Sequence, residues 1–234
     1  MNKIGIIGTG NMGRVIGLAL AQKGYSIFFG ARDLSKAKFA AGFNQTTQYG
    51  TNQQAAEFGD ILYFSPRDIH PKDILQDISV LDNKIIIESN NWNISDSLDA
   101  DQIATSKSQI LQQQIPNAKV VKAFNTITQE LFEHSKEELE AHQVACFIAS
   151  DYQDATRAVI DLSNDLGFNG IDCGLLKQAV LLENAGSLIR ILMRIQKTPW
   201  ISFSITELPV IKELKLGGRT PSSLHTQLSY LKEK

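Results

Sequence analysis

The chain has little that would indicate a membrane, secreted or nucleic-acid-binding protein. Only two of its 234 residues are cysteines, Cys146 and Cys173, and their spacing indicates neither a disulfide framework nor a metal site. No apolar run reaches the roughly 18 residues that cross a bilayer, and a signal peptide is not expected, because the first apolar residues fit a strand. The formal net charge of -2 gives no field that would attract nucleic acid. We therefore predict a cytoplasmic protein with no membrane or nucleic-acid partner.

Recognisable catalytic clusters are scarce as well. No Ser/His/Asp arrangement or metal-ligand spacing occurs, so we predict no metal site and assign no catalytic side chain. The histidines lie scattered in polar stretches, at His70, His134, His142 and His225. Hydride transfer is compatible with this pattern, because there the cofactor carries the chemistry and the protein supplies position and electrostatics.

What the sequence does contain is a glycine motif in an informative context. Residues 3–7 predict a buried strand, and residues 14–22 predict an apolar helix. Between them, one glycine permits the tight turn, the next lets a pyrophosphate approach the backbone, and the last lets the helix pack on the strand. The helix N-terminus would present free N–H groups to the phosphates. This order predicts a dinucleotide site formed by Gly8, Thr9, Gly10, Asn11, Met12 and Gly13.

Strands and helices alternate up to residue 150. Repeated β–helix–β units predict a Rossmann-type α/β fold with a doubly wound, mainly parallel sheet. The predicted strands are residues 26–30, 60–65, 84–88, 119–124 and 144–148, and the predicted helices are residues 34–41, 51–58, 72–78 and 102–113.

The pattern changes after residue 150. An amphipathic helix is expected at 154–166, a short strand at 168–172 and a long apolar helix at 175–195, which indicates burial in a core or a subunit interface. Loops and short helices should follow. We therefore predict a dinucleotide-binding Rossmann domain over residues 1–150 and a smaller, α-rich C-terminal lobe over residues 151–234.

The end of the second predicted strand favours NADP over NAD. NAD-binding versions of this fold place an acidic residue there to hold the ribose hydroxyls. Here the small Gly30 and Ala31 precede Arg32, and Lys36 lies one helical turn further on. A guanidinium and an ammonium suit a 2′-phosphate, although both could be exposed loop cations. Asp33 could be the displaced NAD acid, but we prefer for it the role of helix cap.

Further candidate residues follow the other predicted strands. Ligands of open parallel sheets bind beyond the carboxyl ends of the strands. Asn90, Asn125 and Thr126 could hold the nicotinamide carboxamide and ribose there, although asparagine is also common in ordinary turns.

Several motifs together carry a resemblance to a known family. They are Gly8-Thr-Gly-Asn-Met-Gly13, Gly30-Ala-Arg-Asp33, Val120-Val-Lys-Ala-Phe-Asn-Thr126 and Asp172-Cys-Gly-Leu-Leu-Lys-Gln-Ala-Val-Leu-Leu-Glu183. Over residues 1–195 the chain resembles the NADP oxidoreductases typified by the coenzyme F420 (deazaflavin)-dependent NADP reductase. The same cytosolic module is found in six-transmembrane ferric reductases.

The resemblance implies a cofactor, an acceptor and an assembly. NADPH would be held by Thr9, Gly10, Asn11, Met12, Arg32 and Lys36. The nicotinamide would lie near Ser65, Pro66, Asn90, Ala123, Phe124 and Asn125. A small-molecule acceptor such as F420, FMN or FAD would stack on the nicotinamide, and a homodimer would form through the small lobe.

Departures from the family pattern surround the expected acceptor site. Val180 replaces an arginine of the family, Leu175 replaces a proline, and Ser89-Asn90-Asn91 stands where Thr-Asn-Pro is usual. The acceptor identity therefore stays open.

The favoured function is that of an NADPH-dependent oxidoreductase transferring hydride between NADP(H) and a flavin-like or deazaflavin acceptor. The opening motif is also similar to that of pyrroline-5-carboxylate reductase, an imine reductase whose serine- and threonine-rich C-terminal signature is absent here. A third interpretation is a non-catalytic NADPH-binding sensor or regulatory protein, which the lack of an obvious proton donor permits.

Overall fold

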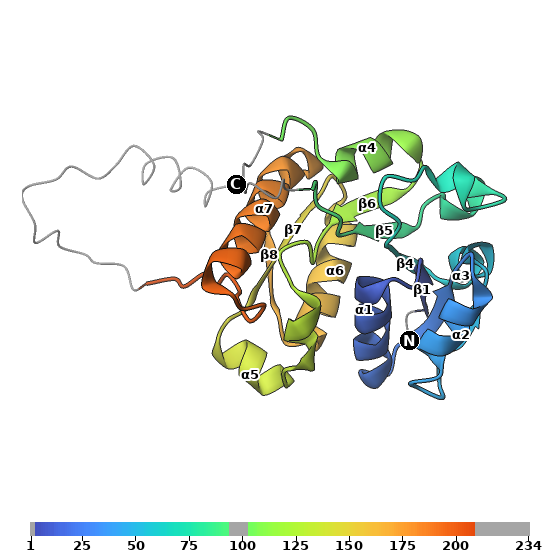
Figure 1. Cartoon of the computed structure of the whole chain (residues 1–234). Helices are drawn as coiled ribbons and strands as arrows, with labels where there is room; N and C mark the ends of the chain where they lie inside the picture. The colour runs from blue at the N-terminus through green and yellow to red at the C-terminus, as the bar shows by residue number, and fades with distance from the viewer. Residues whose placement is uncertain (1–2, 94–102, 209–234) are drawn as a thin grey trace, which may run out of the picture.

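The computed structural model describes residues 3–93 and 103–208, which are built around one eight-stranded sheet (Figure 1). The strand order is β3-β2-β1-β4-β5-β6-β7-β8, and its first six strands follow the Rossmann order. Neighbouring strands are parallel except β6 and β7, which pair antiparallel. The predicted mainly parallel α/β fold is therefore confirmed. The strands are β1 (Lys3–Ile7), β2 (Ser26–Gly30), β3 (Gln48–Gly50), β4 (Ile61–Phe64), β5 (Ile85–Glu88), β6 (Lys119–Lys122), β7 (Ala145–Ser150) and β8 (Asn169–Asp172).

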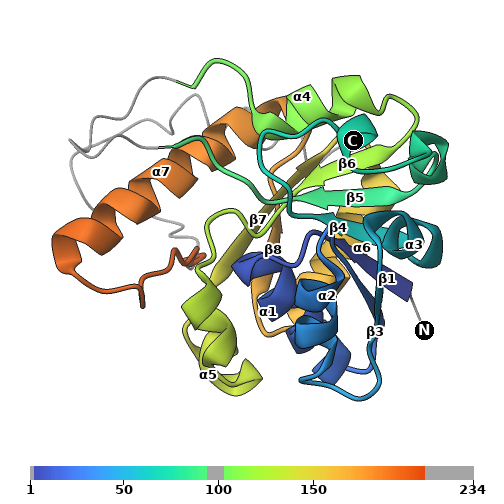
Figure 2. The same cartoon turned by 45° about the vertical axis from the view of Figure 1, so that its right-hand side comes forward.

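Helices lie on both faces of the sheet (Figures 1 and 2). One apolar core joins the sheet to α1, α2, α5 and α6, and a second joins its other face to α3 and α4. The α-helices are α1 (Asn11–Gln22), α2 (Leu34–Ala41), α3 (Asn52–Phe58), α4 (Lys107–Gln114), α5 (Lys136–Ala141), α6 (Gln153–Asp165) and α7 (Ala179–Gln196). None of those in the described part combines the length and apolar composition needed to cross a membrane.

Capping residues fix where several helices begin. Thr51, Ser106 and Ser135 each form a reciprocal capping box with the residue three positions later, at the starts of α3, α4 and α5. Asp33 accepts a hydrogen bond from the Ser35 backbone N–H at the start of α2, which confirms its predicted role as a cap.

The structure corrects some predicted elements. Residues 72–78 do not form an α-helix; two 3-10 turns, Pro71–Asp73 and Ile78–Leu81, occupy this region. The prediction also missed β3 and α5. The helix predicted over 102–113 begins at Lys107, and residue 102 lies outside the described residues.

The segment after residue 150 continues the sheet before it forms the long helix. Strand β8 pairs with β7, and α6 packs against both. A 3-10 turn, Leu176–Gln178, then leads into α7. The proposed lobe boundary near residue 150 stays a prediction, and residues 209–234 of the expected tail lie outside the described residues.

Candidate functional site

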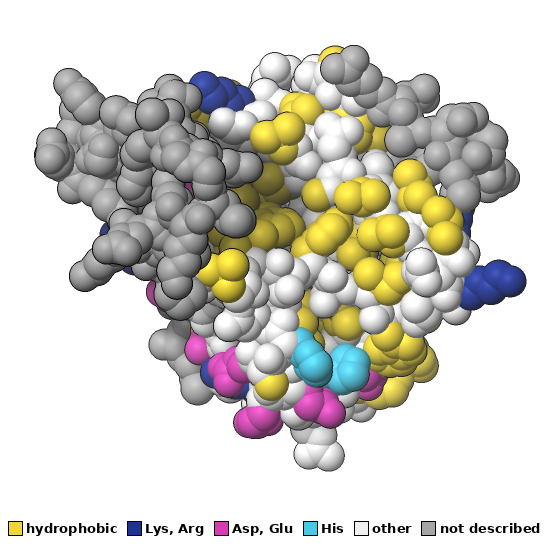
Figure 3. Space-filling model, turned by 90° about the vertical axis from the view of Figure 1, so that its left-hand side faces the viewer, with side chains coloured by type: hydrophobic (Ala, Val, Ile, Leu, Met, Phe, Trp, Pro, Cys, Tyr) yellow, Lys and Arg dark blue, Asp and Glu magenta, His cyan; other side chains and the backbone are white. Residues whose placement is uncertain are grey.

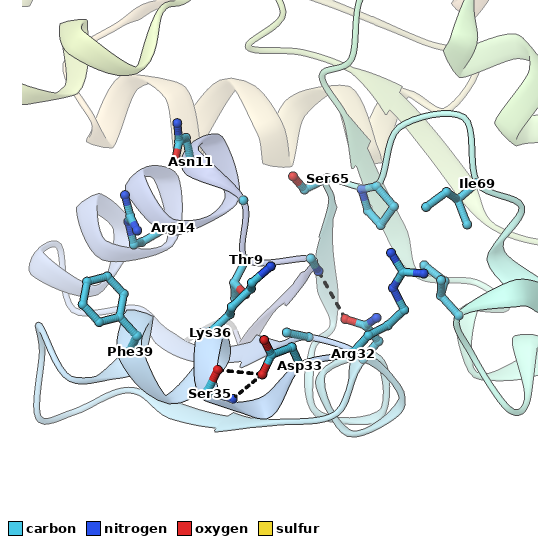
Figure 4. Close-up of a pocket in the computed structure, with 16 residues that line it drawn as sticks. Thr9, Asn11, Arg14, Arg32, Asp33, Ser35, Lys36, Phe39, Ser65 and Ile69 are labelled. Atoms are coloured by element: carbon cyan, nitrogen blue, oxygen red, sulfur yellow. Dashed lines mark hydrogen bonds between the residues drawn. The ribbon is translucent and has the colours of Figure 1, made fainter.

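A cavity of about 900 Å³ opens at the carboxyl ends of β1, β2 and β4 (Figure 4). The strand order reverses here, since β1 lies between β2 and β4, and α/β proteins bind ligands at such a switch point. The cavity brings together predicted residues from three separate turns, namely Gly8, Thr9, Gly10, Asn11, Arg32, Lys36, Ser65 and Pro66.

The glycines of the first turn have different geometric roles. Gly8 has a φ of +87°, which favours glycine. A Cβ on Gly13 would lie 2.3 Å from the Gly8 carbonyl oxygen, so α1 can pack this close only with glycine there. A Cβ on Gly10 would meet only Ser65 Oγ, at 3.8 Å, which leaves open space beside the backbone.

The start of α1 is suited to an anion. Its N-cap residue, Gly10, provides no side-chain hydrogen bond, and the first turn carries no acidic residue. Helix N-termini present free N–H groups and a partial positive charge. Thr9 Oγ1 is buried and lacks a hydrogen-bond partner within the described part of the chain. These features fit a bound phosphate that accepts hydrogen bonds.

Two cations from the segment after β2 line the cavity. Figure 4 shows Arg32 and Lys36 extending into it from the turn that starts α2. Asp33 also lines the cavity, and its Oδ1 accepts from the Ser35 backbone N–H at 3.0 Å and from Ser35 Oγ at 2.6 Å. Hydrogen bonds from Ser35 lower the pKa of Asp33 below its usual value.

Some lining residues of this cavity were not predicted from the sequence, among them Arg14, Phe39 and Asn52. The Arg14 guanidinium lies 5.5 Å from the centre of the Phe39 ring, and both side chains line the cavity. The buried Asn52 accepts a hydrogen bond from the Gly8 backbone N–H at 3.3 Å. The capping box at Thr51 could have indicated Asn52, because it marks Asn52 as the first residue of α3.

A second cavity, of about 460 Å³, adjoins the first and shares Gly10, Asn11 and Ser65 with it. The predicted Met12, Asn90, Asn125 and Thr126 line it, together with Phe124. Ala123, also predicted, is fully buried and is not among the described residues that line either cavity. Apolar, polar and charged side chains complete the lining, including Ile127, Ile189, Met193, Arg67, Arg190 and Glu130.

Asparagine side chains connect this second cavity to α7. Asn125 Nδ2 donates to Asn91 Oδ1 at 2.9 Å and to the Leu182 carbonyl oxygen at 2.7 Å. A Cβ on Gly186 would lie 2.4 Å from Asn91 Oδ1, so glycine gives the loop room to approach the helix. Asn125 Oδ1 is buried with no hydrogen-bond partner among the described residues, so it can accept a hydrogen bond from a ligand.

A buried cluster of three charges lies beneath these asparagines. Lys122 Nζ is 2.9 Å from Glu88 Oε2 and 2.8 Å from Glu183 Oε1, and all three side chains are almost completely buried. Burial raises the pKa of Glu183, and the ammonium of Lys122 opposes this shift. This cluster was not predicted from the sequence, although a lysine in a buried strand and a glutamate in an apolar helix each require a partner.

The charge cluster holds the backbone of Asn90 in place. Glu88 Oε1 accepts from the Asn90 backbone N–H at 2.5 Å, and Lys122 Nζ donates to the Asn90 carbonyl oxygen. Asn90 Nδ2 donates to the Pro66 carbonyl oxygen at 3.2 Å. These bonds link β5, β6 and the turn after β4 at the wall of the second cavity.

The geometry of the first turn agrees with the sequence comparison. Residues 3–91 match the family described as NADP oxidoreductase coenzyme F420-dependent. This match confirms the predicted resemblance. The similarity is thus to NADP oxidoreductases, and it leaves the acceptor unspecified.

Two curated relatives match a longer part of the chain. Metalloreductase STEAP3 of Rattus norvegicus is 24% identical over 77% of the chain and 36% of its own length. Metalloreductase STEAP2 of Homo sapiens is 27% identical over 77% of the chain and 35% of its own length. The chain therefore spans about a third of the length of these relatives.

Solved structures share the fold. A protein of Arthrobacter sp. FB24, described as an F420-dependent NADP reductase, aligns with a TM-score of 0.76 at 20% identity, over 88% of this chain and all of that one. A reductive aminase of Aspergillus terreus in complex with NADPH aligns with a TM-score of 0.60 at 15% identity, over 84% of this chain and 63% of that one. At these identities the likeness shows the fold alone.

Proposed function

We propose that the protein is an NADPH-dependent oxidoreductase that transfers hydride between NADP(H) and a flavin-like or deazaflavin acceptor. The observation that carries this proposal is the pair of adjoining cavities, which share Gly10, Asn11 and Ser65. One cavity has the cations and the glycine turn that fit a phosphorylated nucleotide. The other has apolar side chains and amide groups that fit two stacked rings.

The first cavity would bind the adenosine and pyrophosphate parts of the cofactor. Arg32 and Lys36 would hold the 2′-phosphate, and the backbone N–H groups at the start of α1 would hold the pyrophosphate. Thr9 Oγ1, which has no partner among the described residues, would donate a hydrogen bond to a phosphate oxygen. When bound, NADPH supplies the hydride.

The second cavity would orient the reacting rings. Asn125 Oδ1, with no described partner, would accept a hydrogen bond from the nicotinamide carboxamide, and Asn90 would fix the ring on the side of Ser65 and Pro66. Met12, Ile127, Ile189 and Met193 would pack against the acceptor and exclude water. Hydride transfer between two cofactors requires positioning above all, and the lining of this cavity provides it.

We also propose that two copies associate through α7. Leu181, Leu188 and Ile195 lie seven residues apart on this helix and are 63%, 48% and 59% exposed. This spacing places them on one face of the helix, and Figure 3 shows apolar side chains gathered on that side of the molecule. Leu188→Glu should convert a dimer to a monomer in sedimentation velocity, whereas Phe43→Glu, at an exposed residue after α2, should not. A wild-type monomer would contradict the proposed dimer.

The cytoplasm is the proposed compartment. Cys146 and Cys173 are both free thiols, which is common where thiols are kept reduced.

A titration followed by an acceptor panel tests the proposed function. NADPH and NADH are first titrated against the protein, and NADPH oxidation is then followed with deazaflavin, FMN, FAD, a ferric chelate and pyrroline-5-carboxylate. We expect preferential NADPH binding and turnover with a flavin-type acceptor. Turnover with pyrroline-5-carboxylate alone would favour the imine reductase, and tight NADPH binding without turnover would favour a sensor. Binding of neither nucleotide would contradict all three functions.

A further inference from the structure

We infer that the acceptor carries an anionic group, a phosphate or carboxylate, which Arg67 and Arg190 bind at the second cavity. This inference rests on the proposed function, which identifies that cavity as the acceptor site. It adds a chemical requirement on the acceptor that hydride transfer alone does not impose.

The two arginines approach the cavity from separate elements. Arg67 follows β4, and Arg190 lies on α7. Arg190 Nε donates to the Gly186 carbonyl oxygen at 3.3 Å, and Arg190 Nη2 donates to the Trp92 carbonyl oxygen. Arg67 Nη1 donates to Asn93 Oδ1 at 3.2 Å. All these acceptors are neutral, so the hydrogen bonds orient both guanidinium groups without compensating their charge.

The positive charge at this cavity is not balanced locally. Neither Arg67 nor Arg190 forms an ion pair with a residue in the ranges 3–93 and 103–208. The carboxylate among the described lining residues is Glu130, whose Oε1 accepts from Gln129 Nε2 at 3.1 Å. Arg67 is exposed and Arg190 is partly buried, and holding two cations close together costs free energy that a bound anion would offset.

The pKa of Arg190 reflects the same burial and the same neighbouring charge. Its side chain is half-buried, and burial lowers its pKa, with Arg67 and Arg194 adding to the shift. Arg190 and Met193 also line a separate cavity of about 400 Å³ with Thr198 and Pro199.

The rest of the lining defines the shape of the ligand. Met12, Ile127, Ile189 and Met193 provide apolar contacts for a flat ring. Guanidinium groups pair with phosphate and carboxylate through two parallel hydrogen bonds. A flat redox-active ring with an anionic tail satisfies both parts of the cavity, whereas the same ring without the tail leaves the arginines uncompensated.

FMN and riboflavin test this inference, because they share one ring system and differ by a phosphate. Each is titrated by flavin fluorescence against the full chain saturated with NADP⁺, which separates the acceptor site from the cofactor phosphates. We expect FMN to bind at least about ten-fold more tightly than riboflavin, the gain expected of a charged hydrogen-bonded pair. Arg67→Met and Arg190→Met should each remove most of this preference, which is measured as the ratio of the two affinities. Arg190→Lys should retain part of it, and Arg157→Met, at an exposed arginine of α6, should retain all of it.

Equal affinity for FMN and riboflavin, no binding of either, or a preference that survives both Met substitutions would overturn the inference. Competition identifies the anion: displacement of FMN by inorganic phosphate but not glutarate indicates phosphate, and the reverse indicates carboxylate. Two further outcomes distinguish a failure of the proposed function from a failure of this inference. Preferential, arginine-dependent FMN binding without NADPH oxidation would keep the anion site and contradict hydride transfer, whereas reduction of both flavins with equal KM would keep hydride transfer and overturn the anion site.

Discussion

Lys122 on β6 and Glu183 on α7 form an ion pair in which Nζ and Oε1 are 2.8 Å apart and neither side chain is exposed. The residues are 61 positions apart in the sequence. Lys122 also contacts Glu88, so one ammonium joins the ends of two strands to the long helix. Because Glu88 and Lys122 both bond the backbone of Asn90, this buried contact sets the position of one wall of the candidate acceptor site.

Removing the cation of this cluster should destabilise the fold strongly. Lys122→Met leaves two buried carboxylates without their counter-ion, and breaking a buried pair in this way costs about 3–5 kcal/mol of the free energy of unfolding. Guanidinium chloride unfolding measures the loss. Lys119→Met is the matched control, because Lys119 lies on the same strand and pairs with the exposed Asp154. An equal effect of the two substitutions would contradict the structural role of Lys122.

The pH dependence of stability should reveal the raised pKa of Glu183. Burial raises the pKa of Glu183 above its ordinary value of 4.5, so the folded protein binds more protons than the unfolded chain between the two pKa values. The stability that this group contributes is present below 4.5 and is lost as the pH rises through the raised value. The free energy of unfolding of Glu183→Gln should therefore rise relative to wild type across this window. Parallel pH profiles for the two proteins would contradict the raised pKa.

Substitutions of two glycines in the first turn should have different effects, one on nucleotide binding and the other on stability. Gly10→Ala adds a methyl group where the structure has space, so the fold should remain while NADPH and NADH both bind at least about ten-fold more weakly, a loss of 1.4 kcal/mol or more. Gly13→Ala would place Cβ 2.3 Å from a backbone oxygen and should lower the melting temperature instead. Thermal unfolding and nucleotide titration distinguish these outcomes. Unchanged nucleotide binding by Gly10→Ala would mean that the pyrophosphate lies elsewhere.

The choice between NADP and NAD should depend on Arg32. Arg32→Ala should weaken NADPH binding by about ten- to hundred-fold, as expected for lost charged hydrogen bonds, and affect NADH much less. Lys38→Ala is a suitable control, because Lys38 lies in the last turn of the same helix as Lys36 and is not among the described residues of the cavity. Equal losses for the two nucleotides would show that Arg32 does not bind the 2′-phosphate.

The parts of the site that could be predicted from sequence depend on local signals. The strand, the glycine turn and the helix are consecutive in the chain, so their order alone predicts the first cavity. The prediction of a helix at 72–78 was wrong, because backbone N–H groups of this segment donate to a side chain that is distant in the sequence. Gln53 Oε1 accepts from the N–H groups of Gln76 and Asp77, at 3.0 and 3.2 Å. Such a contact between separate segments leaves no local pattern.

The second cavity was predicted only in part for the same reason. Asn90 and Asn125 follow strands and could be placed at one sheet edge. Arg190 and Glu183 reach that edge from α7, and only the folded structure shows which face of a largely apolar helix points there. Their charge in apolar surroundings was the available signal, but it did not identify their partners.

Transfer of a label from the cofactor to the acceptor tests whether the protein passes hydride between them. NADPH carrying two deuterium atoms at the nicotinamide C4 is mixed with the protein and a deazaflavin, whose reduced ring holds the transferred hydride on carbon. We expect mass spectrometry to find deuterium in the reduced deazaflavin, and we expect Gly10→Ala to slow its appearance. Tight NADPH binding with no deuterium in the acceptor would contradict hydride transfer between these two molecules.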